Sequence, residues 1–364
     1  MAKEHKTSSV VSSRTAHPTI ATIAEHMGLS RATVTHVLNG RAAEQRICPE
    51  TQQRVLDAAG ELGYRANASA RAVRAGRFGS VALIQSHLGQ YLPPELLFGL
   101  TTASTASDLN LVLNEVAHVD ASGESYIEHT MRKLSVDGVL INRHGASPPP
   151  FLNQLRKLHI PAIFLNSKQD FDCIYPDDIE GGKLAAEFLM SLGHERIAYV
   201  ETELRRNPHF SEADRRTGYE RALTAAGKAP FVHRLPVDWR TPGEASVDQR
   251  VDAACKLLAG PNRPTALIAY EMTESMAVVH AAHLLGLRIP ADLSLLHFHH
   301  CIDDRCFIPI HTISNRMREV GEGAVAMLLE KMEAPNHDLP ARTVSETLIE
   351  GATCMAPCHQ FPHR

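Results

Sequence analysis

Residues 19–40 carry apolar side chains at helical spacing, interrupted by the tripeptide Gly28-Leu29-Ser30. Because residues three and four apart share one face of a helix, this pattern predicts two short helices on either side of the tripeptide. Gly28 can adopt the left-handed conformation that ends the first helix, and the Ser30 hydroxyl can cap the second. The pattern is therefore that of a helix-turn-helix, and its apolar positions are Ile20, Ile23, Ala24, Met27, Val34, Val37 and Leu38.

A third helix is predicted from Pro49 to about Leu62, since Pro suits the first turn of a helix and Gly63 suits its end. Three helices of this length can bury one small core. Residues 1–17 are rich in Ser and Thr and contain few apolar side chains, so we expect a disordered arm before the first helix.

After Gly76 the pattern changes to short β-rich runs that alternate with amphipathic helical stretches. Alternation of strands and helices favours parallel sheets with right-handed crossovers, and nearly 290 residues of it are enough for two such lobes. The predicted fold class is thus an α-helical headpiece followed by a two-lobed parallel α/β domain. The runs are VALI (81–84), LVLNEV (111–116), DGVLIN (137–142), AIFLN (162–166), RIAYV (196–200), ALIAY (266–270) and LSLLHF (293–298).

Charge is divided unevenly along the 364 residues. Residues 1–80 hold 11 Lys/Arg and 6 Asp/Glu, a net +5, whereas the remainder holds 26 and 35, a net −9. A basic module on an acidic body suggests that one end meets a polyanion, although an ordinary solvated surface would have the same balance. No apolar run reaches the roughly 18 residues of a membrane span, and no signal peptide is evident, so we expect a cytoplasmic protein that does not engage membranes.

The seven cysteines are scattered through the chain, which favours reduced thiols over a disulfide framework. Two segments carry His and Cys densely enough to suggest metal, HFHHCIDDRC (297–306) and the tail from Cys354 to His363. Adjacent residues at a strand end point in opposite directions, and the tail is expected to fray. We therefore assign no metal site and no cofactor, and the Gly-rich loops that cradle nucleotide phosphates are absent as well.

Several motifs, in this order along residues 18–345, resemble the lactose-repressor (LacI/GalR) family of transcription regulators. The headpiece motifs are TIATIAEHMGLSRATVTHVLNG (19–40) and ETQQRVLDAAGELGYRANASARAV (50–73). Those of the lobes are VDGVLI (136–141), DDIEGG (177–182), LGHERIAYV (192–200), RRTGYERAL (215–223), TALIAYE (265–271) and IPADLSLLHF…FIPIHTI (289–313).

The resemblance implies a repressor that binds double-stranded operator DNA as a homodimer under the control of a small effector. It also implies the domain order: a headpiece at 18–66, a hinge helix at 67–77 and a two-lobed effector domain at 78–353, with a tail at 354–364. We expect lobe one to comprise about 78–178 and 314–340, and lobe two about 179–313 and 341–353. The nine residues of this segment expected to be helical, 67–75, are too few for a stable isolated helix, so folding coupled to DNA binding makes physical sense.

In a helix-turn-helix the second helix enters the major groove, so its first-turn residues and those one turn later face base edges. Arg31 can reach guanine with its planar fork, Ala32 can touch a thymine methyl, and Thr33 and Thr35 can bond phosphates. By resemblance, the hinge inserts the side chain at Val73 between base pairs, where the family typically has Leu. The predicted DNA-binding residues are Thr19, Ser30, Arg31, Ala32, Thr33, Thr35, His36, Asn39, Asn67, Ala70, Arg71 and Val73.

The headpiece departs from the family in three places. His36 replaces the usual Arg, the loop Gly40–Arg46 is about three residues longer, and Cys48 stands where Ser or Thr would cap the third helix. The replacement at His36 indicates a different operator sequence. Arg41 and Arg46 of the longer loop are candidates for additional phosphate contacts.

Two α/β lobes bind ligands at the carboxyl ends of their strands, in the cleft between them. By resemblance, Arg215 grips the effector and Trp239 stacks on it, although a core role for the Trp stays open. Imidazole at His299 replaces a family Asp, which makes an acidic or phosphorylated sugar more plausible than a neutral one. The predicted effector-binding residues are Ser86, Tyr91, Asn142, Arg143, Asn166, Arg215, Trp239, Glu271 and His299.

Three classes of function compete. An effector-controlled regulator accounts for both the headpiece and the lobes, whereas a periplasmic-type binding protein would lack the headpiece and carry an export signal. An enzyme would require placed catalytic partners, and no nucleophile elbow, Ser-His-Asp order or HExxH motif stands in the sequence. The sequence therefore favours a regulator without enzymatic activity.

Overall fold

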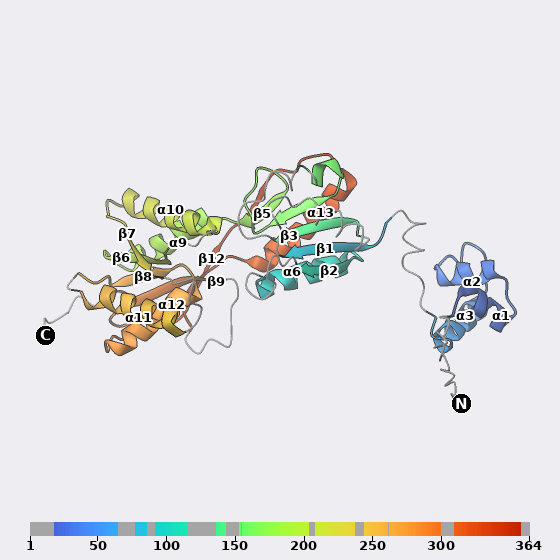
Figure 1. Cartoon of the computed structure of the whole chain (residues 1–364), viewed down its shortest axis with the longest axis horizontal. Coiled ribbons are helices and arrows are strands. Elements are labelled where there is room, and N and C mark those ends of the chain that lie inside the picture. Colours follow the sequence, from blue (N-terminus) through green and yellow to red (C-terminus); the bar gives the residue numbers. More distant parts are fainter. Residues whose placement is uncertain are drawn as a thin grey trace, which may run out of the picture. The chain divides into compact units, whose positions relative to one another are not determined.

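The computed structural model describes residues 18–64, 77–85, 92–115, 136–142, 153, 155–203, 208–236, 244–260, 262–299 and 309–357. The chain divides into two compact units, residues 1–78 and 79–364. Figure 1 shows the elements of each unit, coloured along the sequence.

The first unit contains three helices, α1 (Ile20–Met27), α2 (Arg31–Leu38) and α3 (Pro49–Glu61). Their apolar faces form one core, as predicted, and its members include Ile23, Val34, Val37, Val55 and Ala58. Ile23, Val34 and Val55 have no exposed surface. The spacing of three and four residues therefore identified the buried faces of α1 and α2 correctly.

The second unit is built on two six-stranded sheets, each with helices on its faces (Figure 1). The first sheet has the order β11-β5-β4-β3-β1-β2, and its strand pairs are all parallel. Its strands are β1 (Ser80–Gln85), β2 (Asn110–Glu115), β3 (Gly138–Asn142), β4 (Ala162–Leu165), β5 (Cys173–Pro176) and β11 (Arg342–Val344), and its core includes α6 (Pro94–Ala106) and α13 (Met317–Glu333).

The second sheet has the order β12-β10-β9-β8-β6-β7 and is parallel except for the pair of β12 with β10. Its strands are β6 (Ile197–Thr202), β7 (Phe231–Leu235), β8 (Ala266–Ala269), β9 (Ser294–His299), β10 (His311–Ser314) and β12 (Thr347–Ile349). Its helices are α9 (Asp178–Ser191), α10 (Phe210–Ala225), α11 (Glu244–Ala259) and α12 (Met272–Leu284).

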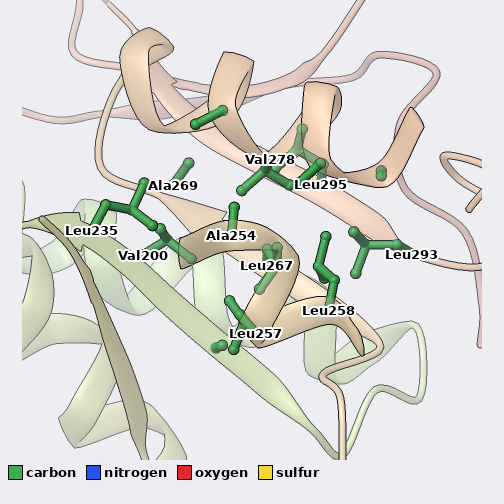
Figure 2. Packing of buried hydrophobic residues seen from close by; sticks show 14 of the residues in the cluster. Val200, Leu235, Ala254, Leu257, Leu258, Leu267, Ala269, Val278, Leu293 and Leu295 are labelled. Atoms are coloured by element: carbon green, nitrogen blue, oxygen red, sulfur yellow. The ribbon is translucent and has the colours of Figure 1, made fainter. Parts of the chain in front are cut away.

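The central strands of this sheet are buried on both faces. Val200, Leu267 and Ala269 pack against α11 and α12 (Figure 2), and Ala198 belongs to the same cluster. The alternate positions pack against α9 and α10. Because side chains alternate across a strand, both faces of β6 and β8 need apolar residues. This requirement explains why these strands read as continuous apolar runs in the sequence.

The predicted division into lobes is wrong at one boundary. β11 lies within the segment 341–353 that we assigned to the second lobe, yet Arg342, Thr343 and Val344 pair with β5 of the first sheet. The chain then passes to the second sheet, where β12 pairs with β10. The crossover therefore falls at residues 345–346. The sequence did not predict this position, because a short edge strand has no hydrophobic pattern that indicates which sheet it joins.

Candidate functional site

The turn of the helix-turn-helix has the predicted geometry. Gly28 has a φ of 66°, and its N–H bonds to the carbonyls of Ala24 and Glu25. The Ser30 hydroxyl accepts a bond of 3.0 Å from the N–H of Thr33 and so caps α2. A residue with a Cβ would be strained at the φ of Gly28, which is why glycine serves here.

The outward face of α2 carries the predicted base-reading residues. Arg31 and Ala32 are exposed, and His36 is half-buried, whereas Val34 and Val37 hold the helix to the core. The Thr35 hydroxyl donates a 2.7 Å bond to the Arg31 carbonyl, so it must turn away from the helix to donate to a phosphate. Thr19 caps α1, and Asn39 follows α2.

The loop after α2 and the start of α3 differ from a standard cap. Arg41 and Arg46 are exposed, and Ala42 is buried in the headpiece core. Cys48 makes no capping bond with its side chain, and its Sγ lies 3.1 Å from the Thr51 hydroxyl. That hydrogen bond lowers the pKa of the Cys48 thiol. The predicted hinge residues Asn67, Ala70, Arg71 and Val73 lie outside the described residues.

In the first lobe, two predicted effector residues lie at carboxyl ends of strands. Asn142 ends β3, is buried, and pairs in register with Gln85 at the end of β1. Asn166 directly follows β4 with a φ of 49°, and its carbonyl accepts a 2.9 Å bond from His209 Nε2. The strand ends of this sheet therefore gather amide groups, while Ser86, Tyr91 and Arg143 lie outside the described residues.

In the second lobe, Arg215 is buried and paired with a carboxylate. Its Nε donates to Asp178 Oδ1 over 2.6 Å, and its Nη1 donates to the Tyr270 carbonyl over 3.1 Å. The guanidinium also lies 5.0 Å from the ring centre of Tyr270 and 4.5 Å from that of Phe298. Burial alone would lower the pKa of Arg215, but the charge of Asp178 together with the other acidic groups around it outweighs burial and raises the pKa.

Two glycines allow this arrangement. A Cβ on Gly182 of α9 would overlap the carbonyl oxygen of Arg215, and a Cβ on Gly218 of α10 would overlap the carbonyl oxygen of Ile179. The backbones of α9 and α10 therefore approach closely where the helices cross. This approach brings Asp178, at the start of α9, to the guanidinium of Arg215 on α10.

Glu271 and His299 lie at the ends of neighbouring strands. β8 and β9 are paired in register at Ala269 and His297, and Glu271 and His299 stand two residues further on. Both side chains are partly exposed. The structure therefore brings Arg215, Glu271 and His299 to the same edge of the second sheet, and Trp239 lies outside the described residues.

His297 is a structural histidine beside this edge. Its Nδ1 is 2.9 Å from the Ser275 hydroxyl, and its Nε2 is 3.0 Å from the Thr312 hydroxyl. Burial, with a smaller contribution from His299, lowers the pKa of His297 to about 3. It is therefore neutral at physiological pH and serves to join α12, β9 and β10.

The sequence missed four residues that connect the two lobes. Lys168 Nζ lies 2.6 Å from Asp214 Oδ2, and the rings of Tyr175 and Phe210 meet edge to face with 5.4 Å between centres. Lys168 and Tyr175 belong to the first lobe, and Asp214 and Phe210 belong to α10 of the second. Single residues in loops and at helix starts carry no periodic pattern, so only the folded chain reveals such pairs.

The residues after β12 are ordered, which corrects the expectation of a frayed tail at its beginning. The Thr353 carbonyl accepts from Leu295 N–H over 2.8 Å, and the Met355 carbonyl accepts from the Ser294 hydroxyl over 3.0 Å. Burial raises the pKa of Cys354 to about 12, so this thiol is protonated at physiological pH. In the part of the chain that the structure describes, no group of three His, Cys, Asp or Glu side chains is placed to hold a metal.

A helical headpiece followed by two parallel α/β lobes defines a class of effector-binding DNA regulator, and comparison with known proteins agrees. Residues 19–67 match the profile of bacterial regulatory proteins of the lacI family, and residues 186–354 match that of a periplasmic binding protein-like domain. The chain therefore carries a lacI-family DNA-binding domain and a periplasmic binding protein-like domain, and it is a DNA-binding transcription regulator of the kind that small effectors control.

Named relatives span most of the chain. The HTH-type transcriptional repressor PurR of Erwinia tasmaniensis is 28% identical over 338 residues, covering 91% of this chain and 95% of the relative. PurR of Escherichia coli is 27% identical over the same shares. These relatives are repressors, and none of the helices in the described ranges is long and apolar enough to cross a membrane.

Solved structures share the fold. The lac repressor dimer bound to operator and the anti-inducer ONPF superposes with a TM-score of 0.76 at 22% identity, covering 93% of this chain and 99% of that one. The transcriptional regulator CelR in complex with cellobiose superposes with a TM-score of 0.61 at 21% identity, covering 92% and 99%. At these identities the likeness is one of fold.

Proposed function

We propose that this protein represses transcription by binding a two-fold operator as a homodimer, with α2 of each protomer in the major groove. The observation that carries the proposal is the arrangement of α2, which exposes Arg31 and Ala32 while Val34 and Val37 anchor its other face. A recognition helix needs one exposed face that presents side chains to base edges and one buried face that holds it to the rest of the headpiece. Binding to the genome places the protein in the cytoplasm.

The second unit offers apolar surface for dimerisation. Phe98 of α6, Leu113 of β2, Val247 of α11 and Leu284 of α12 are each more than two-fifths exposed. Exposed apolar side chains of this size favour protein–protein contact where they lie together in one patch. The dimeric form of the lac repressor supports the same assembly, because two headpieces are needed to read two half-sites.

The cleft between the lobes is the proposed effector site. Asn142, Asn166, Glu271 and His299 lie at or just beyond carboxyl ends of parallel strands, where α/β folds bind ligands. CelR is described with cellobiose and a regulator from Enterococcus faecium with ribose, which supports a sugar or a related small metabolite. The proposed role is regulatory and not catalytic, in keeping with the repressors among the relatives.

DNA binding by the intact protein tests this proposal. An operator is first selected from random duplexes, and its affinity is then measured between low and high salt. We expect one dimer per two-fold site and a linear fall of log affinity with log salt concentration, because Lys and Arg release counterions from phosphates. Binding of a monomer to one half-site, without salt dependence, would overturn the proposal.

A further inference from the structure

Arg215 is tied to the protein in a way that changes its role in the cleft. Its bonds to Asp178 and to the Tyr270 carbonyl use two of the five N–H groups of the guanidinium. Its charge is balanced by a carboxylate 2.6 Å away, and 6% of the residue is exposed. An arginine that binds an anionic ligand needs a positive charge that no carboxylate of the protein already neutralises, and Asp178 neutralises the charge of Arg215.

Asp178 is itself incompletely bonded unless a proton is present. Its Oδ2 is buried without a donor, and both carboxylate oxygens of the neighbouring Glu346 are buried without one as well. A buried acceptor without a donor is costly, and two adjacent carboxylates in a dry site cannot both ionise cheaply. A proton on Glu346 allows this carboxyl group to donate a hydrogen bond to Asp178.

The position of Glu346 favours the protonated form. The residue lies in the crossover between β11 and β12, is 8% exposed, and packs so closely on α9 that a Cβ on Gly181 would overlap its Oε2. Burial and then the charge of Asp178 raise the pKa of Glu346 well above its usual value, and Arg215 opposes them. The charged or titratable groups around the three side chains are Asp177, Tyr199, Asp214 and Tyr270.

We propose that Glu346 is a protonated acid that fixes Asp178 on Arg215, and that Asp178 thereby makes the cleft select uncharged effectors over anionic ones. The inference rests on the proposed effector site and names its ligand class. The three remaining N–H groups of Arg215 can donate to hydroxyl or carbonyl oxygens of a polyhydroxylated ligand. An anion would instead bring a further negative charge to a buried pair that is already neutral. Asp178 is thus a specificity-determining residue and Glu346 a positioning residue.

Asp178→Asn tests the selectivity, because the amide keeps the shape of the side chain and removes its charge. Inorganic phosphate serves as the anionic probe, with binding measured by calorimetry and by thermal shift. We expect phosphate to bind the variant about tenfold or more tightly than the wild type, the worth of a charge-assisted bond. Asp292→Asn is the matched control, since it frees the exposed Arg288 from its 2.8 Å ion pair and should gain little.

Infrared difference spectroscopy tests the proton on Glu346. Wild type minus Glu346→Gln, at pH 7, should show the carbonyl stretch of one protonated carboxylic acid. Glu346→Gln keeps a donor toward Asp178, so it should also keep the weak phosphate binding of the wild type. Absence of the band, or phosphate binding by the wild type as tight as by Asp178→Asn, would overturn the proposal.

These outcomes are separate from those for operator binding. The infrared band and phosphate affinity require no DNA, so their failure leaves the proposed regulator intact. Failure of operator binding leaves the charge state of the cleft measurable. If Asp178→Asn does not fold, the band and the wild type's preference among glucose, glucose 6-phosphate and phosphate decide the matter. A preference for the two anions over glucose would then refute the inference.

Discussion

Lys168 of the first lobe and Asp214 of the second form an ion pair with 2.6 Å between Nζ and Oδ2. His209 supports it from the same helix start by donating to the Asn166 carbonyl over 2.9 Å. Burial lowers the pKa of Lys168, but the hydrogen bond and charge of Asp214 outweigh it and raise the pKa. The Lys168–Asp214 ion pair, which we call the latch, therefore joins the two lobes beside the cleft in which the effector is proposed to bind.

Lys168→Gln should weaken this latch without harming the fold. The Lys168 side chain is 42% exposed, so we expect a loss of less than about 1 kcal/mol in the free energy of unfolding. The effector concentration that gives a half-maximal change in operator binding should shift. In the wild type, movement of the lobes makes or breaks the Lys168–Asp214 pair, and in the variant it does not. Arg342→Gln is the control, since its 2.6 Å pair with Glu330 lies wholly in the first lobe. Equal shifts in both variants would contradict the latch.

Arg31→Ala should cost about 1–3 kcal/mol in operator affinity and relax specificity at one base position. The reason is the exposed guanidinium at the first turn of α2. Arg46→Ala, in the exposed loop, should instead weaken binding to operator and random DNA alike. Competition binding with operators mutated at single positions distinguishes the two. A uniform loss for Arg31→Ala would demote this residue to a phosphate contact.

Gly182→Ala should force α9 away from α10 and cost about 1–3 kcal/mol in the free energy of unfolding. A methyl group there would overlap the Arg215 carbonyl, so the Asp178–Arg215 pair should loosen. Gly60→Ala in α3 is the opposite case, since nothing lies within 4 Å of its added Cβ, and helix propensity predicts a gain of about 0.5–1 kcal/mol. Denaturant titration of both variants measures the difference, and similar effects would contradict the close crossing.

Stability should fall on acidification because of His297. Its folded pKa of about 3 lies below the ordinary 6.5, so between these values the unfolded chain binds more protons than the folded one. The free energy of unfolding should therefore rise with pH across this window, by at most about 1.4 kcal/mol per unit from this residue, and level off above it. His297→Asn should flatten the slope, and the exposed control His26→Asn should not. Urea titrations between pH 4 and 7.5 provide the measurement.

Local chemistry made much of the fold predictable. The headpiece helices, the left-handed Gly28 and the Ser30 cap each depend on a few neighbouring residues, so the sequence was enough to find them. All seven predicted strands are present as β1, β2, β3, β4, β6, β8 and β9. β5, β7, β10, β11 and β12 were not predicted, because most are short or polar and owe their extended form to the strands they pair with.

The candidate effector site was also predictable only in part. The sequence by itself determined which residues end the central strands, and with them Asn142, Asn166, Glu271 and His299, because the carboxyl ends of parallel strands meet at one edge. It also determined that Arg215 belongs to this edge through its resemblance to the lactose-repressor family. Only the tertiary structure decided that Arg215 is neutralised, since Asp178 is 37 residues away in the chain. Electrostatic partners are set by distance in space, and that distance follows from how α9 and α10 cross.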